Sequence, residues 1–154
     1  MRKYRLRPLA SKRLLAGERL VNIDDFEQAE QGENLEEGMI IQLSDGERKL
    51  NAKALVGRQN KGLAWVFTHE EHEDWHEELV LERLEKALEL RKSLLSDDQT
   101  TTTAFRLFNG EGDGIGGVTI DWYAEFIQFN WYSRGIYAYR EWIVTALQEL
   151  LPNI

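Results

Sequence analysis

The sequence predicts an α+β fold in which a compact unit of short strands comes first, followed by a helix, an antiparallel β-hairpin or meander and a C-terminal helix. Three observations predict this order. Short apolar runs separated by turn residues fill the first 70 residues, apolar residues then recur at helical spacing, and a glycine-rich loop lies between two further strand-like runs. With 154 residues, 42% of them hydrophobic, the chain can bury a core as one domain or as two small ones.

The first unit is expected to be a small barrel. Pro8 to Leu15 has the pattern of a short helix, and Gly17 ends it. Four short strands are expected at residues 20–23, 39–43, 50–56 and 63–67. The turn residues Ser44, Asp45 and Gly46 separate the second strand from the third, and the acidic stretch 26–38 is expected to be a loop. Several short strands and one helix in so few residues fit a compact barrel.

The second unit begins where the apolar period changes. Val80, Leu84, Ala87 and Leu88 predict an amphipathic helix over 75–95, with the acidic residues of 70–78 near its positive end. A polar linker at 96–103 then leads to the remaining elements. These are strands at 105–108, 118–122 and 126–132, the last after a turn at Ala124-Glu125, and a helix whose apolar face runs from Tyr139 to Leu150 before Pro152.

The loop between the strands at 105–108 and 118–122 is the most informative segment. It holds five glycines within eight positions, at 110, 112, 114, 116 and 117. Glycine is favoured where the backbone takes positive φ or where another group comes close. Gly112, Gly114 and Gly117 satisfy G-x-G-x-x-G, but a dinucleotide loop must lead into a helix, and the β-branched run starting at Val118 follows here.

A calcium loop is a second interpretation of the same residues. Asn109, Glu111 and Asp113 fall at the first three side-chain ligand positions of an EF-hand. The twelfth position must then be a bidentate glutamate, and it is Ile120. Strands rather than helices are also expected on both sides. The sequence therefore predicts a long hairpin that displays Asn109, Glu111 and Asp113.

This segment resembles the signature of the bacterial large-subunit ribosomal RNA methyltransferases, which transfer a methyl group from S-adenosylmethionine to cytosine C5. The chain departs from the family pattern at Gly116, where a proline is usual, and at Trp122, where an arginine is usual. The second departure leaves any backbone contact of that arginine in doubt. The matching residues are Phe105, Arg106, Asn109, Gly110, Glu111, Gly112, Asp113, Gly114 and Asp121.

The resemblance implies a division of the chain into a PUA-like RNA-binding domain, residues 1–70, and a central α/β domain, residues 71–154. The catalytic Rossmann domain, which would bind S-adenosylmethionine, is expected to be absent, so that the chain is a truncated and non-catalytic part without a cofactor of its own. Enzymes of the family use a cysteine as the nucleophile that adds to cytosine C6, and this sequence has no cysteine. Arg106, Asn109, Glu111 and Asp113 are expected near the catalytic cleft, at either the RNA entrance or a domain interface.

Net charge argues against an RNA partner, but its distribution does not. The chain carries −8, which should repel phosphates. Residues 1–20 hold seven cations and one acid, residues 48–68 hold five cations and no acid, and residues 21–47 hold nine acids. Two basic segments can form one positive face for ribosomal RNA, although ordinary solvated charges would give the same pattern. The predicted phosphate contacts are Arg5, Lys12, Arg13, Arg48, Lys49, Arg58 and Lys61.

Two further patterns allow other functions. His72 to His76 satisfies H-E-x-x-H, the zinc protease signature, but it lies at an expected helix start where acids are favoured by the helix dipole, so no metal site is predicted. Aromatic residues are dense between Trp122 and Trp142, and they fit a core better than a base-stacking platform because few cations lie among them. An acidic module that docks a protein partner without RNA stays open as the alternative.

The expected surroundings of the chain follow from what it lacks. No run approaches the roughly 18 to 20 apolar residues that span a bilayer, so no membrane partner is expected. The absence of cysteine leaves the compartment open, with the cytoplasm as the default. The expected partners are ribosomal RNA and the missing C-terminal methyltransferase domain, and a homodimer is left open.

Overall fold

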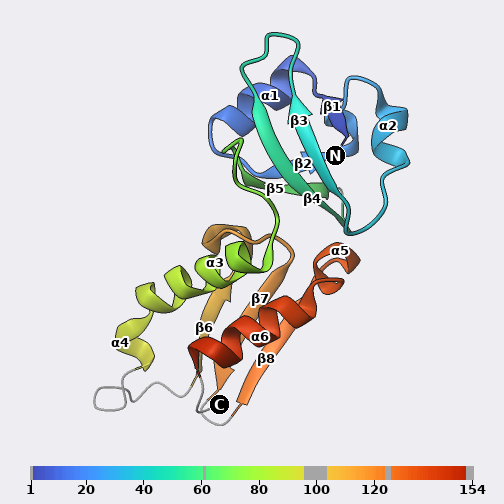
Figure 1. Cartoon of the computed structure of the whole chain (residues 1–154). Coiled ribbons are helices and arrows are strands. Elements are labelled where there is room, and N and C mark those ends of the chain that lie inside the picture. The colour runs from blue at the N-terminus through green and yellow to red at the C-terminus, as the bar shows by residue number, and fades with distance from the viewer. Residues whose placement is uncertain (1, 61, 96–103, 124–125, 152–154) are drawn as a thin grey trace.

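The computed structural model describes residues 2–60, 62–95, 104–123 and 126–151. It has an α+β fold with a strand-rich N-terminal unit and a C-terminal unit of helices on a three-stranded sheet (Figure 1). The predicted fold class is therefore confirmed. The predicted linker 96–103, the turn at Ala124-Glu125 and the stop at Pro152 lie outside the described residues.

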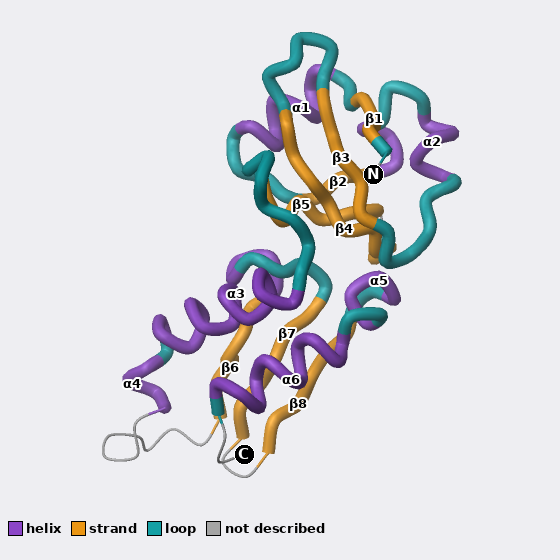
Figure 2. The backbone as a smooth tube through the Cα atoms, viewed as in Figure 1, coloured by secondary structure: helices purple, strands orange, loops and turns teal. Residues whose placement is uncertain are grey.

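A curled five-stranded sheet forms the N-terminal unit (Figure 2). Its spatial order is β1-β3-β4-β5-β2, with β1 parallel to β3 and the other neighbours antiparallel. Register shifts at Lys53/Ala54 and Val56/Gln59 interrupt the long strand β4, and such irregularities increase the local twist. The strands are β1 (Lys3–Arg5), β2 (Leu20–Asn22), β3 (Ile40–Ser44), β4 (Asn51–Gln59) and β5 (Gly62–Thr68).

Short helices close this sheet. The predicted helix is confirmed as α1 (Pro8–Leu15), which buries Ala10 and Leu14. The expectation of a loop over 26–38 was wrong, because this stretch contains α2 (Ala29–Glu33), preceded by the 3-10 turn η1 (Ile23–Asp25). Buried Phe26 and Leu35 anchor the two sides of α2, and this packing stabilises a helix too short to be predicted from its period.

The C-terminal unit is an antiparallel sheet of order β6-β7-β8 with α3 and α6 side by side on one face (Figure 1). The predicted meander and C-terminal helix are thus confirmed. A short helix before α6 was not predicted. The elements are α3 (Glu77–Leu90), α4 (Lys92–Leu95), β6 (Ala104–Asn109), the 3-10 turn η2 (Gly110–Asp113), β7 (Val118–Tyr123), β8 (Phe126–Trp131), α5 (Arg134–Tyr137) and α6 (Arg140–Leu150).

The helix expected over 75–95 begins later and is interrupted. His76 is extended and caps the helix, because its Nδ1 accepts the backbone N–H of Glu78 at 3.2 Å. Residue 91 leaves helical geometry, so α4 is separate from α3. No helix in the described ranges is both long enough and apolar enough to cross a membrane.

The two units share packing. Leu55 of β4 and Phe67 of β5 belong to the core of the C-terminal unit rather than to that of their own sheet. The Tyr139 hydroxyl donates to the Gly38 carbonyl at 2.6 Å across the junction. Gly135 lies so close to the Val56 carbonyl that a side chain would overlap it. The predicted boundary at residue 70, with domains 1–70 and 71–154, stays a prediction.

Candidate functional site

The glycine-rich loop folds into a compact turn rather than an open hairpin tip. Asp113 accepts the backbone N–H of Asn109 at 2.6 Å and binds the Arg91 guanidinium at 2.8 and 3.2 Å. Only 7% of its side chain is exposed. The expectation that the loop displays Asp113 was therefore wrong, because a helix-borne arginine draws its carboxylate inward. Asn109 and Glu111 are exposed, as expected.

Two glycines of this loop are required by contacts within the chain. Gly114 has φ of +101°, in the left-handed region, and the Arg83 side chain lies against it. A side chain at Gly116 would overlap the ring of Trp65, which comes from β5. The backbone freedom of the loop therefore serves its packing against the N-terminal unit and α3, and it does not by itself require a further domain.

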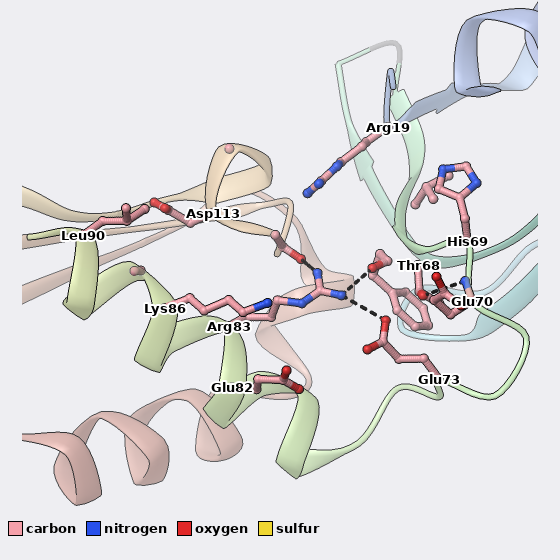
Figure 3. A pocket seen from close by; sticks show the side chains of 15 residues that line it. Arg19, Thr68, His69, Glu70, Glu73, Glu82, Arg83, Lys86, Leu90 and Asp113 are labelled. Carbon is pink, nitrogen blue, oxygen red and sulfur yellow. Dashed lines mark hydrogen bonds and ion pairs between the residues drawn. The ribbon is translucent and has the colours of Figure 1, made fainter. Parts of the chain in front are cut away.

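Three arginines, Arg19, Arg83 and Arg91, bind the turn from outside, and Figure 3 shows the first two. Arg83 of α3 donates to the carbonyls of Gly114 and Phe67, both at 2.9 Å, and pairs with Glu73 at 3.2 Å. Arg91 also donates to the Arg106 carbonyl at 2.8 Å. Arg19, from the N-terminal unit, donates to the Glu111 carbonyl at 2.7 Å. The turn is thus fixed relative to both units.

A cleft of about 530 Å³ lies between β5, α3 and this turn (Figure 3). Arg19, His69 and Lys86 line it together with Glu70 and Glu82. Burial lowers the pKa of the His69 imidazole, and the nearby charge of Arg19 acts in the same direction. The cleft therefore presents cations and carboxylates in mixture rather than a strongly positive surface.

The sheet face opposite α3 and α6 is polar. Because Phe105, Trp122 and Phe129 pack toward the core, their strand neighbours point away from it. On that face Asp121 binds Arg106 and Asn130, each at 2.9 Å. The hydrogen bond to Asp121 raises the pKa of the Arg106 guanidinium. Arg106 is thus on an uncovered sheet face, about half exposed and already paired.

The predicted phosphate-binding residues fall into two groups. Lys12 of α1 and Lys49 of the β3–β4 turn line one depression, so the two basic segments do meet there. Arg48 in the same turn is exposed, and Arg5 is exposed with Glu27 at 3.9 Å. Lys61 lies outside the described residues.

Arg13 and Arg58 form the second group, because both already have protein partners. Arg13 binds both carboxylate oxygens of Asp25 at 2.9 Å, and this hydrogen bonding raises the pKa of its guanidinium. Arg58 donates to the Leu35 carbonyl at 2.7 Å and pairs with Glu37 at 3.7 Å. These bonds leave their guanidinium groups less available to phosphates than the side chain of Lys12, or than Lys49, whose pair with Glu47 at 3.1 Å is exposed to solvent.

Sequence reasoning missed a buried lysine. Lys53 of β4 counts as a surface cation in the charge pattern, yet it is 5% exposed and holds the segment between the two units. Its ammonium group donates to the carbonyls of Glu71 and Glu73 and to Asp74, at 2.7 to 2.9 Å. The available signal was that both faces of β4 are apolar, because Leu55 lies on the same face as Lys53 while Ala52 and Ala54 lie on the other.

The histidine motif does not have the geometry of a zinc protease. His72 lies in the turn before α3 and His76 caps that helix, so the two rings are not one helical turn apart. Within the described ranges no group of three histidine or acidic side chains is placed to hold a metal ion.

The aromatic residues divide between core and surface. Trp122, Phe129 and Trp142 pack against the C-terminal core, as favoured from the sequence. Phe126, Tyr132 and Tyr137 are 59%, 46% and 45% exposed. The dense aromatic region therefore supplies both a core and single exposed rings.

Comparison with known proteins shows what parts of this chain are similar to. Residues 5–69 match the model of a family described as a PUA-like domain. A Bacillus subtilis protein whose name places it among the ribosomal RNA large subunit methyltransferases is 41% identical over 118 residues, which cover 76% of this chain and 29% of that protein. Over this shared length the chain is similar to proteins named as large-subunit ribosomal RNA methyltransferases. Ribosomal RNA large subunit methyltransferase I of Alteromonas mediterranea is 40% identical over 90 residues, covering 58% of this chain and 22% of that protein.

Solved structures agree with the sequence relatives. A Streptococcus mutans protein described as an S-adenosylmethionine-dependent methyltransferase superposes with a TM-score of 0.86 and 30% identity, covering 99% of this chain and 39% of that one. A methyltransferase solved with S-adenosylhomocysteine gives the same TM-score and identity, and the match covers 99% of this chain and 38% of that one. The chain thus matches less than half the length of these relatives, which fits the predicted N-terminal part of the family.

Proposed function

We propose that this chain is the RNA-binding and substrate-positioning N-terminal portion of an S-adenosylmethionine-dependent methyltransferase that acts on cytosine C5 of large-subunit ribosomal RNA in the cytoplasm. The PUA-like domain and the names of the relatives support this function. In this proposal the cofactor binds to the C-terminal domain of the whole protein. The cysteine that adds to cytosine C6 must also come from there, because this sequence contains none.

One observation carries the proposed RNA contact. Lys12 and Lys49, 37 positions apart in the sequence, line the same depression of about 310 Å³ on the N-terminal unit. Asp45 also lines it, but its carboxylate accepts the Ser11 hydroxyl at 2.6 Å and two backbone N–H groups. Glu47 also lines it and pairs with Lys49 at 3.1 Å, but both of these side chains are at least 70% exposed, so a phosphate can compete for the lysine. Lys12, Arg48 and Lys49 together outnumber the carboxylates of Asp45 and Glu47 around this depression.

The loop residues have a different proposed role. Arg106 and Asn109 lie on the uncovered sheet face and Glu111 on the turn beside it, where RNA or a further domain can reach them. Asp113 acts indirectly, since its carboxylate fixes the turn through Arg91 and the Asn109 N–H. We propose that this face borders the RNA entrance in the whole protein.

Anisotropy titration of labelled large-subunit ribosomal RNA fragments over a salt series tests the phosphate contacts. Lys12→Ala and Lys49→Ala should each weaken binding and reduce the slope of log K against log salt by about one. Lys92→Ala on α4 is the matched control, since it removes the same charge from an exposed site far from the depression. Absence of binding at low salt would favour the acidic protein-docking alternative. An equal effect of Lys92→Ala would show that the depression is not the phosphate-binding surface.

A further inference from the structure

We infer that the depression between Trp65 and the glycine-rich turn binds an unpaired nucleobase of the RNA. This inference rests on the proposed function and assigns one part of the ligand to one site. The depression has a volume of about 350 Å³, and residues of both units line it. Gln59 and Trp65 come from the N-terminal sheet, whereas Asn109, Thr119 and Tyr132 come from the C-terminal unit.

The lining chemistry fits a neutral polar ligand. Gln59 and Asn109 each offer an amide that both donates and accepts, and Thr119 and Tyr132 each offer a hydroxyl. Among the lining residues that the structure describes, Glu111 is the single charged one. Among these described residues a phosphate would meet a negative charge and no cation, whereas the edge of a base presents donors and acceptors that amides and hydroxyls can match.

Two aromatic residues strengthen this assignment. Tyr132 is 46% exposed, so its ring is accessible for stacking on a base. The Trp65 Nε1 atom is buried and has no hydrogen-bond partner among the described residues. Buried donors are almost always paired, and a carbonyl oxygen of a base would supply the missing acceptor if a small shift of the Trp65 ring exposed this N–H.

Cations lie close enough to hold the phosphates of the same strand. Gly112 lines both this depression and the cleft that contains Arg19 and Lys86. A strand with one base in the depression can pass over Gly112 and place its backbone beside these two side chains. The mixed cleft and the uncharged depression then contact different parts of one nucleotide strand.

A substitution at Gly112 can block the site for a test. Its backbone lies outside the left-handed region, and the nearest heavy atom to an added Cβ is the Asn109 Nδ2, at 3.5 Å. Unlike Gly114 and Gly116, it has no neighbour within this chain that requires a glycine. Gly112→Leu should therefore place a side chain at the shared rim without backbone strain.

Two labelled single-stranded oligoribonucleotides of one length test the inference, one with all four bases and one abasic with the same phosphates. The wild-type chain should bind the base-bearing strand at least about fivefold more tightly, the low end of what one stacked base contributes. Asn109→Ala, Gln59→Ala and Gly112→Leu should each remove most of this preference and leave abasic binding unchanged. Gln148→Ala, an exposed glutamine on α6, is the matched control, and thermal unfolding verifies that each variant folds.

The outcomes separate this inference from the proposed function. Equal binding of the two strands by the wild-type chain would overturn the nucleobase site while leaving RNA binding intact. A base preference that all three variants retain would place the base elsewhere and also overturn it. If neither strand binds at low salt, both the proposed function and the inference fail.

Discussion

Removal of the Asp113 carboxylate should destabilise the whole C-terminal unit. The side chains of Asp113 and Arg91 are 7% and 18% exposed, and the carboxylate accepts three hydrogen bonds. Loss of one partner of a buried ion pair costs about 3–5 kcal/mol. Arg91 keeps two carbonyl acceptors, on Arg106 and Ala87, and remains partly hydrated. We therefore expect Asp113→Ala to lower the free energy of unfolding by about 2–3 kcal/mol.

Urea denaturation followed by circular dichroism measures this loss, and at this chain length the midpoint of thermal unfolding should fall by about 4–12 °C. The double variant Arg91→Met/Asp113→Ala should be less destabilised than the sum of the single variants, by about 1–3 kcal/mol. Glu27→Ala is the control, because Glu27 and Arg5 are more than half exposed and 3.9 Å apart. A loss below about 0.5 kcal/mol for Asp113→Ala, or strict additivity, would refute this reasoning.

Two other predictions concern stability. Gly116→Ala should lower the free energy of unfolding by about 1–3 kcal/mol in the same urea assay, because the added Cβ would overlap Trp65. Gly46→Ala is the control. It has no atom within 4 Å of the added Cβ, so it should change this free energy by less than about 0.5 kcal/mol. Hydrogen bonds from Ser11 and Lys53 lower the pKa values of Asp45 and Asp74 below 3.8. Their contribution to stability is therefore present above about pH 4 and is lost as the pH falls further. Asp45→Asn should accordingly make the free energy of unfolding fall less steeply at acid pH. An unchanged acid limb of the curve would contradict this assignment.

The elements with a clear period could be predicted from the sequence. The helix at 8–15, four strands of the first sheet, the meander and the last helix all follow from apolar spacing and turn residues. β1, α2 and α5 have three to five residues, too few for a period to show. They form because tertiary neighbours complete them, as β3 does for β1.

The candidate site was predictable in position but not in detail. The glycines indicated that other groups come close to this segment, and in the structure those groups belong to both units of this chain rather than to a missing domain. The inward orientation of Asp113 depends on Arg91, which lies 22 positions earlier. A pattern of neighbouring residues cannot predict a contact over that sequence separation. The same limit explains Arg13, Arg58 and Lys53, whose charges were visible in the sequence but whose partners are set by the fold.

The placement of Leu55 and Phe67 in the neighbouring core has a mechanical consequence. A hinge between the units would have to pull both side chains out of apolar surroundings, so bending at this junction is opposed in the folded state. The chain should melt in a single transition and tumble as one body. Under the proposed function, RNA bound at Lys12 and Lys49 would then stay at a constant distance from the uncovered sheet face. The two units together would set that distance.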